Sequence, residues 1–165
     1  MKQIIGIVAV VLWFAGCATA LTSAEKTAGA QRREQQLADG MARHTFIVDV
    51  NYVTPRRMSP RFLTAPYRVE LANDSLKSYL PYFGVAYHAD ISHENRSPLD
   101  FEAPVTAYES HSNSKGEHRI TVEAGQGLEH YTYLFEIYPN GKASLDVIPS
   151  GRESISFSGE FRFKE

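Results

Sequence analysis

The sequence predicts a mostly β protein of the α+β class. We expect an N-terminal helix and then an antiparallel sheet or flattened barrel of about seven to nine strands, its C-terminal half a meander. From Thr45 onward, apolar and polar residues alternate along several segments, as in strands with one face in a core and one in water. Turn-forming residues separate these segments, and 165 residues suit a single domain.

Residues 1–16 have the pattern of a signal peptide that ends just before Cys17. Lys2 provides the positive charge, and residues 4–14 form an apolar run of signal-peptide length, shorter than the ~20 residues of a membrane span. Two small residues precede Cys17, so the segment is similar to a bacterial lipobox, with Phe in place of the usual Leu three positions earlier. We expect acyl chains on Cys17, the only cysteine. The alternative is an ordinary secretory signal that is cleaved after Ala18 or Ala20, so that Cys17 is discarded.

Residues 17–22 then form the anchor and linker, and residues 23–42 the predicted helix. Thr22 and Glu25 have the spacing of a capping box. Apolar positions in this stretch are sparse, so we expect the helix partly to pack on the domain and partly to act as a spacer. A mobile tether is the alternative. The single β-rich domain spans residues 43–165.

The predicted strands follow in chain order. Apolar residues alternate over 46–52 and 67–71, and five more strands are expected in the second half. Those five are 104–112, 117–124, 129–138, 142–149 and 153–163. The Asn-Gly pair at 140–141 favours a type I′ hairpin turn, which needs positive φ at both positions. The Asn-Asp pair at 73–74 indicates a further turn.

Residues 75–103 alternate poorly and are expected to form a short strand or turn followed by a long ordered loop. The possible rim residues of a binding site here and nearby are Tyr79, Tyr82, Phe83, Tyr87, His88 and Arg152. The side chains of these residues would face a ligand or a partner protein. In the favoured alternative, Tyr79 and Phe83 plug one end of the sheet. Arg152 would bind an acid or satisfy backbone carbonyls at its turn, and the second role is favoured.

No catalytic residue, metal site or cofactor is predicted. Residue types that bind zinc occur at His88, Asp90, His93, Glu94 and Asp100. The two histidines are five residues apart on an expected loop, and the chain contains no HExxH motif. It also contains no GxSxG motif of a nucleophilic serine. The carboxylates of Asp100 and Glu102 are expected on an exposed strand edge rather than in a catalytic cleft.

The charge of the chain gives no indication of a nucleic-acid partner. The formal net charge is −2, and binding to nucleic acid requires a basic stripe or patch. The cluster of Arg56, Arg57 and Arg61 is too short to provide one.

Three segments are similar to a known family. They are SYLPYFG at 78–84, PLDF at 98–101 and RESISFSG at 152–159. The chain resembles the Bacteroidetes lipoproteins of domain-of-unknown-function family 4251. The resemblance implies the cell envelope of a Gram-negative bacterium and a polar helix before a β-rich domain, and it implies no activity. The residues after Cys17 lack an acidic run that would favour the cell surface, so we expect an outer-membrane anchor facing the periplasm, with surface exposure left open.

The expected function is that of a membrane-tethered envelope lipoprotein of unknown activity, with a non-enzymatic module that binds a small apolar ligand, a glycan or an envelope partner. The alternatives are a hydrolase with its site in loop 85–103, and a structural or assembly role. A large closed apolar cavity would favour ligand binding, whereas convergence of His88, His93 and an acid would favour the enzyme.

Overall fold

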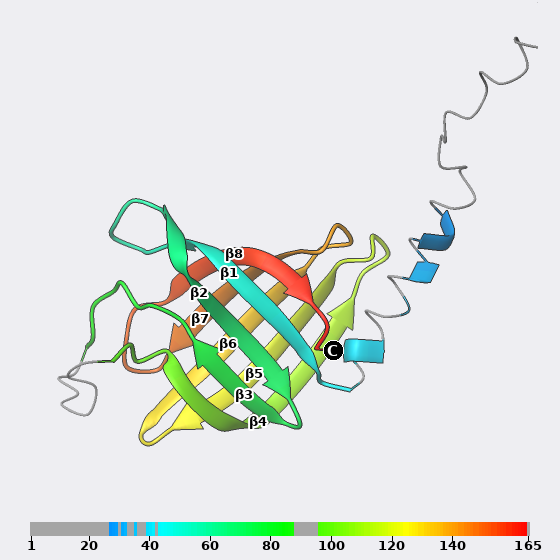
Figure 1. Ribbon diagram of the computed structural model, residues 1–165. Helices are drawn as coiled ribbons and strands as arrows, with labels where there is room; N and C mark the ends of the chain where they lie inside the picture. Colours follow the sequence, from blue (N-terminus) through cyan, green and yellow to red (C-terminus); the bar gives the residue numbers. More distant parts are fainter. Residues whose placement is uncertain are drawn as a thin grey trace, which may run out of the picture. The chain divides into compact units, whose positions relative to one another are not determined.

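The computed structural model describes residues 27–29, 31–32, 35, 39–41, 43–87 and 96–164. The chain divides into two compact units, Met1–Arg32 and Arg33–Glu165. The described part of the second unit forms a closed antiparallel barrel of eight strands (Figure 1). The strands are β1 (Phe46–Thr54), β2 (Arg61–Ala72), β3 (Ser75–Tyr79), β4 (Asp100–Ser112), β5 (His118–Gln126), β6 (Glu129–Ile137), β7 (Lys142–Pro149) and β8 (Ile155–Arg162).

Each strand pairs with the next one along the chain, and β8 closes the barrel by pairing with β1. In this last pairing Val48 lies opposite Phe161 and Val53 opposite Phe157. Closure removes the open edges that a flat sheet would leave. The predicted antiparallel fold is therefore confirmed, and the barrel is the form that it takes.

Apolar side chains fill the interior of the barrel. The largest fully buried ones include Phe46, Tyr133, Phe135, Leu145 and Phe157. The rings of Phe46 and Phe135 pack edge to face with centroids 5.2 Å apart. Small eight-stranded barrels are commonly filled in this way. The alternation that predicted strands in the second half of the chain identified this inward face correctly.

In β1 the alternation predicts Tyr52 in the core, and this is wrong. A β-bulge between Val50 and Tyr52 shifts the register, which reverses the inward face of the strand beyond it. Val53 is therefore buried, whereas Tyr52 is half-buried and packs against Phe62 with ring centroids 5.0 Å apart.

The expected loop over 75–103 is shorter than predicted. Residues 75–79 form β3, and β4 begins at Asp100 rather than at residue 104. Phe101 and Ala103 are buried while Glu102 is exposed, so these few residues do alternate. The register with β3 places Ser78 opposite Phe101. That long-range pairing makes the segment a strand, although its own pattern is too short to predict one.

The type I′ turn lies at a different place from the predicted one. Asn73 and Asp74, between β2 and β3, have φ values of 52° and 55°. At 140–141 only Gly141 has a positive φ, of 82°. Pro139 precedes this pair, and proline fixes φ near −65°, which suits a three-residue turn with a final left-handed glycine.

The continuous helix predicted over 23–42 is not supported. Helical residues there are described only at 27–29, 31–32, 35 and 39–41. Those from 27 to 35 are exposed, so they gain none of the packing that stabilises most protein helices. The remainder of the stretch, the signal segment and Cys17 lie outside the described residues. Within the described residues, no helix has the length and hydropathy to cross a membrane.

Candidate functional site

The connections between strands divide the barrel into two different ends (Figure 1). One, here called the turn end, carries the β2–β3, β4–β5 and β6–β7 turns. The other, here called the loop end, carries the connections β1–β2 (55–60), β3–β4 (80–99), β5–β6 (127–128) and β7–β8 (150–154). Residues 88–95 of the second of these connections lie outside the described residues.

At the loop end, the start of the β3–β4 connection is fastened to the β7–β8 connection. The Tyr87 N–H donates to the Gly151 carbonyl (2.9 Å), and the Glu153 N–H donates to the Val85 carbonyl (3.1 Å). The Tyr82 hydroxyl donates to the carbonyl of Glu153 (2.9 Å). Backbone hydrogen bonds thus fasten this segment across the loop end. Of the two predicted plug residues, Phe83 packs against the core, whereas Tyr79 is exposed.

A nearly buried ion pair lies beneath this segment. The Arg152 Nε is 2.9 Å from the Glu129 Oε1, and their side chains are 10% and 16% exposed. The Tyr131 hydroxyl donates to the Glu129 Oε2 (2.6 Å), with the Pro98 carbonyl oxygen 3.0 Å away. Burial, and then the neighbouring Glu129, raise the pKa of the Tyr131 phenol well above its usual range. Of the two roles considered for Arg152, the structure shows it binding an acid.

A second carboxylate at the loop end is also neutralised internally. Glu153 is only 6% exposed, and its Oε1 lies 2.6 Å from the Nε of Arg57. Its Oε2 accepts a hydrogen bond from the Val85 N–H (3.3 Å). Burial raises the pKa of the nearby Tyr82 to about 12, although Arg152 opposes the shift. These groups hold the connections in place, and none of them is arranged as an acid–base pair in a cleft.

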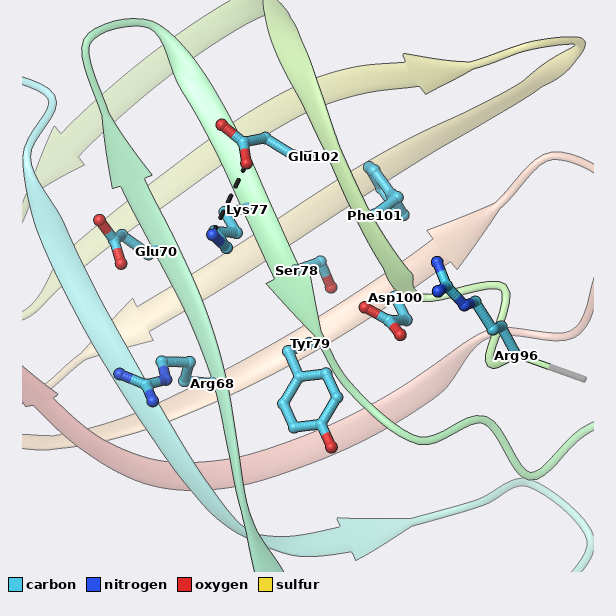
Figure 2. Close-up of a pocket in the computed structure, with 9 residues that line it drawn as sticks. All are labelled: Arg68, Glu70, Lys77, Ser78, Tyr79, Arg96, Asp100, Phe101 and Glu102. Carbon is cyan, nitrogen blue, oxygen red and sulfur yellow. Dashed lines mark ion pairs between the residues drawn. The ribbon is translucent and has the colours of Figure 1, made fainter.

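An open groove runs over the outer face of β2, β3 and β4 (Figure 2). Its volume is about 480 Å³, and an adjoining pocket of about 440 Å³ shares Tyr79, Arg96 and Asp100 with it. We call the two together the outer groove. Its charged and aromatic lining residues are Arg68, Glu70, Lys77, Tyr79, Arg96, Asp100 and Glu102.

Part of the charge in the outer groove is unpaired. Glu70 pairs with Lys164 (2.6 Å), and Lys77 lies 3.7 Å from Glu102. In contrast, no ion pair or side-chain hydrogen bond joins Arg68, Arg96 or Asp100 to another residue in the described part of the chain. The Tyr79 ring beside them is exposed. The groove thus offers guanidinium donors, a carboxylate acceptor and a flat aromatic face.

A second groove, of about 490 Å³, lies near the turn end and includes His111, His118 and Arg119. Arg119 pairs with Glu136 (2.6 Å), and the Tyr138 hydroxyl donates to the same carboxylate (3.1 Å). The bond from Arg119 lowers the pKa of Glu136. Because its main charges are satisfied internally, this groove is the weaker candidate.

Comparison with known proteins agrees with this architecture. The model of the family described as domain of unknown function (DUF4251) matches residues 28–161. The chain belongs to this family. A crystal structure of a DUF4251 family protein from Bacteroides eggerthii is similar in fold, with a TM-score of 0.60 over 80% of this chain and 88% of that chain, at 13% sequence identity. Comparison with curated proteins gave no match. The family resemblance predicted from the sequence is therefore confirmed.

In this DUF4251 protein the predicted rim residues occupy different places. Tyr79 lines the outer groove, and Tyr82 lines its adjoining pocket. Phe83 packs against the core, with the guanidinium carbon of Arg61 4.0 Å from its ring centroid. Tyr87 is exposed near the β7–β8 connection. His88 lies outside the described residues.

The predicted chemistry of the β3–β4 loop is only partly described. Asp90, His93 and Glu94 lie outside the described residues, as does His88. Among the residues that the structure does describe, no group of three or more His, Cys, Asp or Glu side chains could hold a metal ion. Asp100 lines the outer groove instead.

Sequence analysis missed Arg68, Lys77 and Arg96, which line the same groove. In the sequence, Arg68 and Lys77 are polar members of alternating strands, a pattern that indicates only a solvent-facing side. The pairing of β2 with β3 places Arg68 opposite Tyr79 and so brings Arg68 and Lys77 to the same groove.

Proposed function

We propose that this chain is a lipid-anchored cell-envelope protein whose barrel is a non-enzymatic binding module, and that its ligand is a saccharide bound in the outer groove. One observation carries the proposal. The exposed Tyr79 ring shares the groove with Arg96 and Asp100, whose charged groups have no ion-pair partner among the described residues.

The packed interior favours a site on the outside of the barrel. Buried side chains from every strand form its core. Protein cores are close-packed, so a ligand could enter only by displacing these side chains. The outer groove needs no such rearrangement, and its two parts have the volumes typical of small-molecule sites.

The groups in the groove match the chemistry of a sugar. The apolar C–H face of a sugar ring packs on a flat aromatic ring such as that of Tyr79. Each hydroxyl group both donates and accepts hydrogen bonds, so it can pair with a guanidinium of Arg68 or Arg96 and with the carboxylate of Asp100. Because both signs of charge line the groove, a polar ligand with many hydroxyls suits it better than an apolar one.

The N-terminal sequence supports the proposed location of the protein in the cell envelope. Cys17 follows a short apolar run and two small residues. Two or three acyl chains on this residue would give stable anchoring. We assign the anchor to the outer membrane facing the periplasm, since no acidic run follows the cysteine. The hydrolase alternative gains no support from the described part of loop 85–103.

The anchor is tested by metabolic labelling with a fatty acid and by membrane fractionation. We expect the Cys17→Ser chain to lose the label and to accumulate in an unprocessed form. Normal processing and membrane partitioning of this variant would refute the lipoprotein assignment.

The binding site is tested with the lipoprotein in detergent and with soluble muropeptides, the sugar–peptide fragments of peptidoglycan, as the probe. We expect Tyr79→Ala and Arg96→Ala each to weaken binding about tenfold or more, as for residues central to an interface. Tyr87→Ala and Arg43→Ala are the matched controls, because both side chains are exposed and neither lines the groove. Absence of binding, or equal losses in the controls, would refute the saccharide site.

A further inference from the structure

The exposed apolar side chains are concentrated at one end of the barrel. The large apolar residues that are strongly exposed in the described part of the chain are Met58, Phe62, Tyr79, Val85, Tyr87, Leu128 and Ile148. Tyr79 belongs to the outer groove. The other six lie in the connections of the loop end or within two residues of them. The described residues of the turn end contribute none.

The three most exposed of these side chains come from different elements: Tyr87 and Leu128 from two connections, and Phe62 from the start of β2. Leu128 is 99% exposed, Phe62 79% and Tyr87 61%. Leu128 occupies a two-residue turn, where small and polar residues are the usual choice. An exposed apolar cluster on a soluble domain commonly marks an interaction surface. The cluster therefore requires a partner that covers side chains at separate tips.

The exposed charges around these tips are mainly positive. The exposed charged residues of the described loop-end connections are arginines, at positions 56, 57 and 96, and Arg61 follows at the start of β2. Of the acids there, Glu129 and Glu153 are paired with arginines and largely covered, and Asp100 is half-buried in the outer groove. Arginine beside exposed aromatic and aliphatic side chains suits a partner that is both anionic and apolar.

We propose that the loop end docks on an anionic lipid bilayer. Phe62, Tyr87 and Leu128 would enter the headgroup region, and Arg56 and Arg61 would bind lipid phosphates. The tips lie on separate elements, Tyr87 and Leu128 on two connections and Phe62 at the start of β2. A bilayer accommodates such tips without a matching shape, whereas a protein partner would need one.

The anchor of the proposed function permits this orientation, although docking does not depend on it. The chain enters the barrel at Phe46, at the turn end. Residues 18–40 can extend to at most ~80 Å, while β4, with 13 residues, is ~44 Å long. The connection is thus long enough for the loop end to reach the membrane that holds the anchor. A tether also raises the effective concentration of a weak second contact.

The test uses residues 18–165, so that acyl chains cannot cause binding; the barrel core is made within this range, and circular dichroism checks its folding. The probes are phosphatidylcholine vesicles with and without phosphatidylglycerol, in a flotation assay. We expect binding to the anionic vesicles, weakened about tenfold without phosphatidylglycerol and by added salt.

The double variant Phe62→Ser/Leu128→Ser should lose at least about tenfold in vesicle binding, and so should Arg56→Ala/Arg61→Ala. Tyr79→Ala is the matched control: it should leave vesicle binding unchanged while weakening saccharide binding about tenfold or more. The two proposals can therefore fail separately.

Equal vesicle binding by the double variant, or no binding by the unaltered chain, would overturn the lipid proposal. So would a concentration-dependent dimer, seen by light scattering, that Phe62→Ser/Leu128→Ser abolishes without vesicles. That result would assign the loop end to contacts between copies of the chain.

Discussion

The two ends of the barrel are held in shape by different forces. At the turn end the connections are short and are held largely by residues close in sequence. The Gly141 N–H donates to the Tyr138 carbonyl (2.9 Å), and the Asn113 Oδ1 accepts from the N–H groups of Lys115 (2.9 Å) and Glu117 (3.1 Å). At the loop end the connections are held to one another by bonds between residues far apart in sequence, through the backbone and through side chains such as Glu153, which binds Val85 across 68 positions of sequence. Local chemistry therefore determines one end and tertiary structure the other. The second kind of end is the one that commonly carries binding residues.

The largest expected effect comes from removing the covered ion pair at the loop end. Arg152→Ala leaves the Glu129 carboxylate largely covered and without its cation, so we expect the free energy of unfolding to fall by about 3 kcal/mol. Arg119→Ala breaks the exposed pair with Glu136 near the turn end and should cost at most about 0.5 kcal/mol. Urea denaturation measures both, and equal losses would contradict the difference between the two ends.

The second-largest effect is expected from alkaline pH, which should lower the stability that the loop end contributes to the fold. Burial raises the pKa of Tyr82 to about 12 and that of Tyr131 further. Above about pH 10 the unfolded chain loses phenol protons that the folded chain retains, so it binds fewer protons and stability falls as pH rises. Urea midpoints measured from about pH 9 to pH 11 should fall less steeply in Tyr131→Phe than in the unaltered chain. An unchanged slope would show that this phenol contributes nothing.

A smaller effect is expected from the backbone of the turn end. Gly141 has a φ of 82°, where a side chain is strained, so Gly141→Ala should cost about 1 kcal/mol. Asn140→Asp, at a neighbouring position without positive φ, keeps an oxygen that can accept from the Lys142 N–H and should cost less. Thermal unfolding of the two variants measures the difference, and the reverse order would contradict the turn geometry.

The smallest effect is expected at the tip of the β5–β6 turn. Leu128 is 99% exposed, so Leu128→Ser should change the free energy of unfolding by less than about 0.5 kcal/mol. A larger loss in urea denaturation would mean that this side chain supports the fold, and it would remove the reason to seek a partner for it.

The sequence predicts the fold best where the signal is local. The alternation in β5 to β8 identified their inward faces because each strand is regular over its whole length. It failed at Tyr52, where a bulge reverses the face, and at Phe101, where pairing with Ser78 of another strand completes a short pattern. Both wrong predictions depend on the register between paired strands, which the sequence of a single strand does not determine.

The candidate site was less predictable than the fold. Tyr79 was predicted as a possible rim residue because it belongs to a group of aromatic residues in a segment with little periodicity, and Asp100 was considered only as a metal ligand or a catalytic acid. Arg68 and Arg96 come from different elements, and the folded barrel brings them to one groove. Likewise, the pairing of Arg57 with Glu153 gives no sign in the sequence, where each residue resembles an ordinary surface charge.

The seam between β1 and β8 has a consequence for the order of folding. Asp49 and Arg162, which pair across it, are 113 residues apart in sequence. Every other strand pair joins neighbours along the chain, so seven hairpins can form as the chain emerges, while the last pairing must wait for the C-terminal strand. A chain that is still being synthesised is therefore an open sheet with two unpaired edges, β1 and the most recently completed strand. Closure of a long loop of this kind makes folding slow, and chaperones have the longest access to the chain during that interval.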